Sequence, residues 1–227
     1  MLKITKSIII LILLTVCLSN ITFLSAETIN SDIEKRANIL LNELPEQIEK
    51  VIIVIPQETI YRADVLAYER IDKEWNMVHI TQGFVGRNGV ITEKREGDGS
   101  TPIGDYTFGM AFGVADDPGS KLKYTKLTDN DVWVDDVKSK FYNQWSQMDN
   151  PDIDWDSIEH LIKYPEAYKY VLSINYNTDP IIPGNGSAIF LHCSTDRPTA
   201  GCISVSDDSM VFFLKFVDEI TQISILK

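Results

Sequence analysis

The sequence predicts a single, mainly β domain with a few helices, preceded by a secretory signal segment. Three observations support this prediction. Apolar runs after residue 50 are mostly short and are separated by glycine-rich turns, which is typical of strands. No repeat, low-complexity tract or linker divides this part of the sequence. A chain of 227 residues, 44% hydrophobic and 24% charged, is also long enough to bury a core without structural staples.

The N-terminal residues have the pattern of an export signal. Lys3 and Lys6 precede an apolar run over residues 7–18, and a site of small residues follows at Ser25 and Ala26. We therefore expect residues 1–26 to be a signal peptide and the remainder to be exported. An uncleaved segment that anchors the protein in the membrane is the alternative, although the run is short for a membrane span.

The charge balance excludes one class of partner. Thirty-three acidic residues against 21 basic ones give a formal net charge of −12. Because nucleic-acid binding depends on basic side chains that neutralise phosphates, we do not expect a nucleic-acid partner.

The elements of the domain can be predicted in order. Residues 27–50 contain apolar residues at helical spacing, with Ser31 as a possible cap and Pro45 as an interruption, so we predict an N-terminal helical segment. A last helix begins near Ser206. The predicted strands between them and after them cover Val51–Ile55, Asp64–Ile71, Asn76–Thr81, Asp105–Met110, Tyr170–Asn175, Ala188–Leu191 and Gln222–Leu226.

The cysteines leave two hypotheses open. Cys17 lies in the signal segment, so Cys193 and Cys202 would remain in an oxidising compartment, where a disulfide between them is one possibility. The other possibility is a nucleophilic Cys202 that is deprotonated by His192, ten residues earlier.

The pleat of a strand separates these hypotheses. Residues 187–192 are expected to be extended, so neighbouring side chains point to opposite faces. If His192 faces Cys202, then Cys193 faces away from it and a disulfide is excluded. We favour the cysteine–histidine pair, in which the imidazole accepts the proton of the thiol. Gly201 would let a substrate carbonyl approach the backbone, where the amides of Gly201 and Cys202 could form an oxyanion hole.

Several segments resemble one enzyme family. Ala188–His192 followed by Pro198–Ile203 is similar to the active-site signature of the L,D-transpeptidase catalytic-domain family. Lys94–Tyr106 resembles the threonine-proline-glycine turn of that family, and Trp133–Asp136 and Tyr142–Asn143 resemble one branch of it.

The resemblance extends over residues 51–227 and implies a fold and an activity. The fold would be a β-rich sandwich or barrel, and the protein would face the bacterial cell wall or be secreted. The activity would be acyl transfer on peptidoglycan stem peptides, which serves cell-wall organisation and cell shape. Cys202 would be the nucleophile and His192 the general base, and the backbone carbonyl of Cys193 would orient the imidazole. No cofactor is implied.

Two departures from the family pattern concern the acceptor. Ala200 stands where the better-known branch has a second histidine, and Ser204 stands where arginine or asparagine is common. An L,D-carboxypeptidase that uses water as the acceptor is therefore the alternative enzyme. The non-enzymatic alternative is a wall-associated domain with a Cys193–Cys202 disulfide.

Further site residues are predicted less directly. The four predicted substrate-contacting residues are Trp133, Tyr142, Thr199 and Arg197. Core packing explains the two aromatic residues equally well. Because the three histidines of the chain have no close pairing, we expect no metal site.

Overall fold

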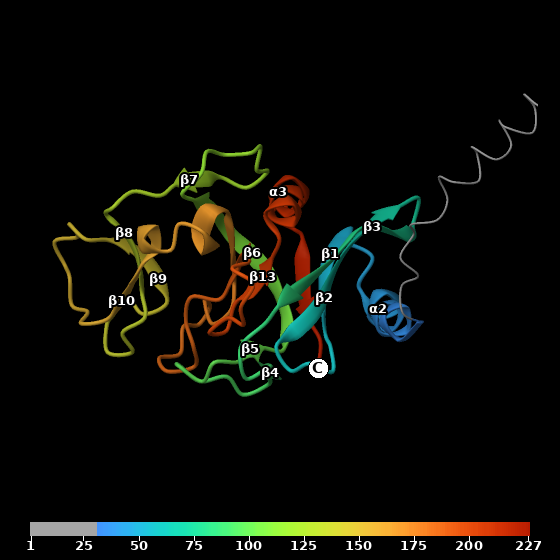
Figure 1. Ribbon diagram of the computed structural model, residues 1–227, viewed down its shortest axis with the longest axis horizontal. Helices are drawn as coiled ribbons and strands as arrows, with labels where there is room; N and C mark the ends of the chain where they lie inside the picture. The colour runs from blue at the N-terminus through green and yellow to red at the C-terminus, as the bar shows by residue number, and fades with distance from the viewer. Residues whose placement is uncertain (1–30) are drawn as a thin grey trace, which may run out of the picture. The chain divides into compact units, whose positions relative to one another are not determined.

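A computed structural model describes residues 31–227, so the predicted signal segment and Cys17 lie outside the described residues (Figure 1). Residues 36–227 form one compact unit. Helix α2 (Ser31–Glu43) begins before this unit and lies within residues 27–50, where the sequence predicts a helix. Among the described residues, no helix has the length and apolar character that a membrane crossing requires.

The main sheet has nine strands, in the order β11-β12-β13-β3-β2-β1-β14-β6-β7. An additional pairing between β11 and β6 closes it into a barrel, with β7 attached outside the ring. The bounds are β1 (Lys50–Pro56), β2 (Arg62–Ile71), β3 (Glu74–Phe84), β6 (Gly104–Gly113), β7 (Tyr124–Lys126), β11 (Val171–Ile174), β12 (Phe190–Cys193), β13 (Ile203–Val205) and β14 (Gln222–Ile225).

A small second sheet lies beside the barrel (Figure 1). It contains β8 (Asp131–Val134) between β9 (Gln144–Gln147) and β10 (Ile158–His160), and two short 3₁₀ helices follow it, η1 (Leu161–Lys163) and η2 (Ala167–Lys169). The short strands β4 (Val90–Ile91) and β5 (Thr101–Pro102) form a separate pair.

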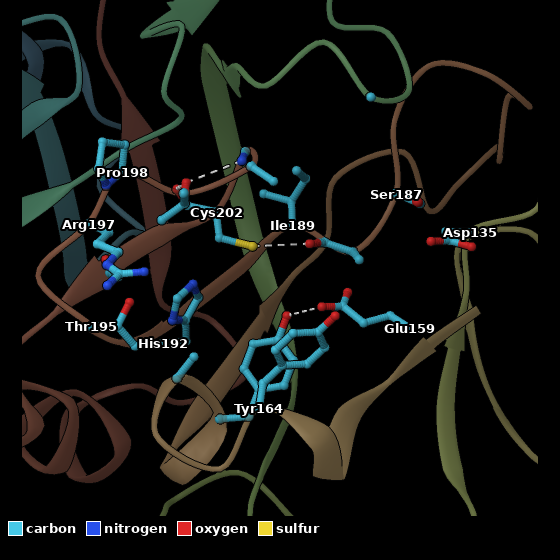
Figure 2. A pocket seen from close by; sticks show the side chains of 18 of the residues that line it. Asp135, Glu159, Tyr164, Ser187, Ile189, His192, Thr195, Arg197, Pro198 and Cys202 are labelled. Atoms are coloured by element: carbon cyan, nitrogen blue, oxygen red, sulfur yellow. Dashed lines mark hydrogen bonds between the residues drawn. The ribbon is translucent and has the colours of Figure 1, made fainter. Parts of the chain in front are cut away.

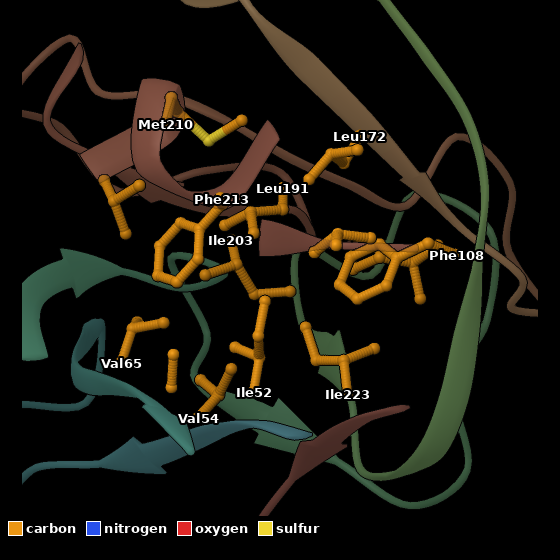
Figure 3. Packing of buried hydrophobic residues seen from close by; sticks show 14 of the residues in the cluster. Ile52, Val54, Val65, Phe108, Leu172, Leu191, Ile203, Met210, Phe213 and Ile223 are labelled. Carbon is orange, nitrogen blue, oxygen red and sulfur yellow. The ribbon is translucent and has the colours of Figure 1, made fainter. Parts of the chain in front are cut away.

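Two buried clusters hold these layers together, and the barrel strands contribute to both. The larger cluster contains inward-facing residues of the barrel, such as Ile52, Leu191 and Ile203, and Phe213 of the last helix (Figure 3). The second cluster contains Phe190, which lies on the opposite face of β12 and packs against Trp133 of the small sheet. Alternation along each strand therefore produces one core inside the barrel and a second core under the small sheet.

Helix α3 (Asp207–Phe216) begins as the sequence predicts. Ser206 is its N-cap, and the Ser206 side chain accepts a hydrogen bond from the Ser209 amide. Its buried face contributes Met210, Phe213 and Leu214 to the barrel core. Capping at one end and burial of an apolar face explain why this helix was predictable.

The mainly β prediction is confirmed, whereas several elements were missed. Each predicted strand corresponds to an observed one, although β12 begins two residues later than expected, because Ala188 has a positive φ of 52°, and ends two residues later, at Cys193. The small sheet and β13 were not predicted, because strands of three or four residues leave little alternation to detect.

Candidate active site

Strand β12 delivers the candidate base to the outer face of the barrel. It pairs in parallel with β13, with Leu191 opposite Ile203 and His192 opposite Ser204. Leu191 and Cys193 point into the barrel core, so His192 points to the other face, where Cys202 is buried in the second cluster. The predicted alternation is therefore present.

Cys193 and Cys202 are both free thiols, so the disulfide alternative is wrong. Because the two side chains belong to different buried clusters, on opposite faces of β12, a bond between them would require the strand to be rebuilt. The non-catalytic alternative that depended on this disulfide loses its basis.

A cavity of about 500 Å³ contains both candidate catalytic side chains in its wall. In Figure 2, the imidazole of His192 and the sulfur of Cys202 both face this space. The two residues are only 8% and 9% exposed, so a substrate that fills the cavity would displace most of the water around them.

The thiol and the imidazole each have a backbone partner. The Cys202 thiol donates to the carbonyl oxygen of Ala188 at 3.2 Å, and Nδ1 of His192 lies 2.8 Å from the carbonyl oxygen of Cys193. Because a carbonyl can only accept, Nδ1 carries the proton and Nε2 keeps its lone pair. Within residues 31–227 no hydrogen bond joins His192 to Cys202 directly.

Burial keeps both groups uncharged. Desolvation lowers the pKa of His192 to about 4. The backbone carbonyls of Cys193 and Ala167 act in the opposite direction and raise this pKa. Desolvation, together with the charge of Glu159, raises the pKa of Cys202 to about 12. The free site therefore holds a neutral thiol beside a neutral imidazole, not a preformed thiolate–imidazolium pair.

Two threonines hold the loop that carries Cys202 through hydrogen bonds to its backbone. The Thr199 hydroxyl donates to the Cys202 carbonyl at 2.6 Å, and the Thr101 hydroxyl donates to the same oxygen at 3.2 Å. Thr101 also accepts a hydrogen bond from the Gly86 amide. These bonds explain the threonine of the threonine-proline-glycine turn: it supports the backbone of Cys202.

Gly201 occupies a position that only glycine accepts easily. Its φ is 155°, and a Cβ there would lie 3.0 Å from the Ser100 carbonyl oxygen. Its amide donates to the Thr199 hydroxyl at 3.2 Å. The expected contribution of the Gly201 amide to an oxyanion hole is therefore not supported, because that amide already has a partner. The Cys202 amide stays the predicted donor.

Trp133 and Tyr142 do not line the cavity. The indole of Trp133 donates to Asn143 and packs edge-on against Phe190, and the Tyr142 hydroxyl donates to Glu96. Both side chains belong to the core packing around the site, which was the competing interpretation of these residues.

Asn143 connects this packing to the catalytic loop. Its Oδ1 accepts from Trp133 and from the Ala188 amide, each at 3.0 Å, and its amide nitrogen donates to the carbonyls of Tyr176 and Asn177. The Asn143 side chain therefore positions Ala188, whose carbonyl accepts the Cys202 thiol proton.

Of the other predicted contact residues, Arg197 and Thr199 both line the cavity. Arg197 is exposed at its rim, whereas Thr199 is committed to the Cys202 loop. Lys94 also lines the cavity, with its ammonium paired to Asp98 at 2.8 Å and its side chain almost fully buried.

Three cavity residues were missed by sequence reasoning. Glu159 on β10 accepts a hydrogen bond of 2.5 Å from the Tyr168 hydroxyl, and the Tyr168 ring packs edge-on against His192. Asp135 follows β8 and lines the same wall as Glu159. Glu159 and Tyr168 stand in no spacing that signals a site, and Asp135 lies in the Trp133–Asp136 segment without being singled out there. The pairing of β8 with β10 brings Asp135 and Glu159 together.

No group of three or more histidine, cysteine, aspartate or glutamate side chains able to hold a metal ion occurs in the described part of the chain.

Comparisons with known proteins identify the family of this chain. The family model of the L,D-transpeptidase catalytic domain matches residues 49–225, and the chain therefore belongs to this family of peptidoglycan-modifying enzymes. A search of curated proteins finds no match.

Solved structures with detectable similarity are distant. Bd1075 of Bdellovibrio bacteriovorus is 14% identical with a TM-score of 0.42, and the match covers 79% of this chain and 48% of that one. L,D-transpeptidase 1 of Mycobacterium tuberculosis is 12% identical with a TM-score of 0.33, covering 78% of this chain and 63% of that one. The chain thus spans less than two thirds of either protein.

Proposed function

We propose that this protein is an exported L,D-transpeptidase that uses Cys202 to transfer acyl groups between peptidoglycan stem peptides. Membership of the family supports peptidoglycan as the substrate. The observation that carries the cysteine mechanism is the placement of a free, buried thiol and a correctly protonated imidazole in the wall of one cavity.

The first half-reaction makes a thioester. The Cys202 sulfur turns from the Ala188 carbonyl and attacks the substrate carbonyl carbon, while its proton passes to Nε2 of His192. The Cys193 carbonyl stabilises the imidazolium through Nδ1. That proton then passes to the leaving amine as the peptide bond breaks, which restores the neutral imidazole and releases the terminal D-amino acid.

The second half-reaction reverses these roles. An amine of a neighbouring stem gives a proton to His192 and attacks the thioester carbon, and the thiolate leaves and takes the proton back. Because the pKa of Cys202 is about 12 and that of His192 is about 4, an ion pair is unfavourable in the empty site. Proton transfer is therefore coupled to formation of the sulfur–carbon bond.

Export is part of the proposal and rests on the N-terminal sequence pattern. The basic start, the apolar run over residues 7–18 and the small residue Ala26 would direct the chain to the cell wall, where stem peptides are found.

The experiment is a product analysis of a purified tetrapeptide muropeptide incubated with the wild-type protein, Cys202→Ala and Cys193→Ala. We expect cross-linked dimers with wild type and Cys193→Ala, and no conversion with Cys202→Ala. Trimmed monomers without dimers would show that the protein is an L,D-carboxypeptidase and not a transpeptidase. Conversion by Cys202→Ala at the wild-type rate would refute the cysteine mechanism.

A further inference from the structure

The cavity has an acidic wall that the acyl-transfer mechanism does not use. Glu159 lies on β10 opposite Trp133 of β8, and Asp135 follows Trp133 by two residues. Residues two apart on an extended chain point to the same side, so the two carboxylates lie diagonally on one face. Both line the cavity that holds Cys202, and in Figure 2 they lie on the side of Cys202 away from Arg197.

The oxygens of these two carboxylates receive fewer hydrogen bonds than they can accept. Glu159 receives one hydrogen bond, from Tyr168 to Oε1, within the described residues. The Oδ1 atom of Asp135 is buried and has no hydrogen-bond donor in the described part of the chain. No lysine or arginine forms an ion pair with either residue there. A buried acceptor without a donor is unfavourable, so the wall is complementary to a cationic donor from outside.

The charge of this wall acts on the nucleophile. After burial, the carboxylate of Glu159 is the second cause that raises the pKa of the Cys202 thiol, and the Phe190 amide and the ammonium of Lys94 oppose this shift. The pKa of Glu159 is itself raised to about 7 by burial, with Asp135 and Glu96 adding to the effect and the bond from Tyr168 opposing it. Near neutrality a cation would therefore favour the carboxylate form and cancel the charge that disfavours the thiolate.

We propose that Glu159 and Asp135 form a subsite for a primary ammonium group of the donor stem peptide, and that occupation of this subsite promotes attack by Cys202. An ammonium has three donors, which suits the unfilled acceptor positions of two carboxylates. The inference deepens the proposed function, on which it rests. It makes Glu159 a specificity-determining residue that selects a donor with a charged side chain.

The first test compares two donors and three proteins. The donors are a stem tetrapeptide with a side-chain amine and the same peptide with a methyl group in place of the amine. For wild type we expect kcat/KM to favour the charged donor by roughly 10- to 100-fold, because a hydrogen-bonded charge pair is lost with the other donor. In Glu159→Gln this preference should fall to near unity.

Glu166→Gln is the matched control, since Glu166 is exposed beside η2 and does not line the cavity. It should keep the wild-type preference. Glutamine at 159 still accepts from Tyr168, so the variant retains the local hydrogen bond. An equal loss of rate on both donors in Glu159→Gln, or an unchanged preference, would overturn the subsite.

The second test does not require turnover. The rate at which iodoacetamide alkylates Cys202 is measured in Cys193→Ala protein, with and without pentylamine, at constant ionic strength and with 1-pentanol as the neutral control. We expect pentylamine to accelerate alkylation of the Cys193→Ala protein. Adding Glu159→Gln should make alkylation faster than in Cys193→Ala alone, and pentylamine should then have no effect on the rate. No effect of pentylamine, or the same acceleration in Glu159→Gln, would refute the subsite. An amine response without any peptide turnover would instead reject the proposed function and keep the subsite.

Discussion

The two sheets of this protein make different contributions to one cavity. The barrel provides the proposed reacting groups: His192 from β12 and Cys202 from the loop before β13. The small sheet provides charge and support, through Asp135, Glu159 and the neighbouring Asn143. Barrel strands are fixed on both sides by neighbours, whereas the small sheet contacts the site through individual side chains.

This difference suggests that the barrel carries out the reaction and that the small sheet selects the donor peptide. Removing a barrel group should stop the reaction for every donor, because both proposed half-reactions use the same thiol and imidazole. Changing a small-sheet group should alter which donor is used or how well the loop is held. The following predictions test that division, beginning with the largest effect.

His192→Gln should lower kcat/KM by about 10²- to 10⁴-fold for all donors, since a general base is removed. Steady-state kinetics measure the effect, and circular dichroism checks that the barrel is folded. His79→Gln is the control, because His79 stacks on Phe212 of α3 and lies outside the cavity. A similar loss in both variants would mean that His192 acts through stability.

Asn143→Ala should destabilise the protein by about 2–4 kcal/mol, because the indole of Trp133 and the amide of Ala188 lose their acceptor. Urea denaturation measures the change. Asn76→Ala removes only an exposed local bond and should change the free energy of unfolding by less than about 0.5 kcal/mol. Equal stability of the two variants would show that Asn143 does not hold the loop.

The pH dependence of kcat/KM should distinguish the two regions. The base form of His192 is lost only as the pH falls through about 4, because burial lowers its pKa. For the neutral donor we therefore expect an acid limb near pH 4. For the charged donor the Glu159 carboxylate is also needed, so the rate should decline already below about pH 7. Identical pH profiles for the two donors would show that Glu159 does not select the charged donor.

The sequence predicted the barrel side of the site better than the other side. Alternation along residues 187–192 placed His192 and Cys193 on opposite faces, and Ser206 marked the start of α3. Glu159 could not be found in this way, because it depends on the pairing of two strands of three and four residues. Whether Trp133 and Tyr142 face the cavity or the core was left open, since this depends on contacts with other segments of the chain.

The most direct measurement is the intact mass of the protein during turnover of the charged donor, after rapid acid quench. We predict a transient species that is heavier than the free protein by the mass of the donor peptide minus the mass of the released D-amino acid. It should be present in wild type and Cys193→Ala and absent in Cys202→Ala. A covalent adduct of that mass in Cys202→Ala, or turnover by wild type without any adduct, would contradict attack by the Cys202 sulfur.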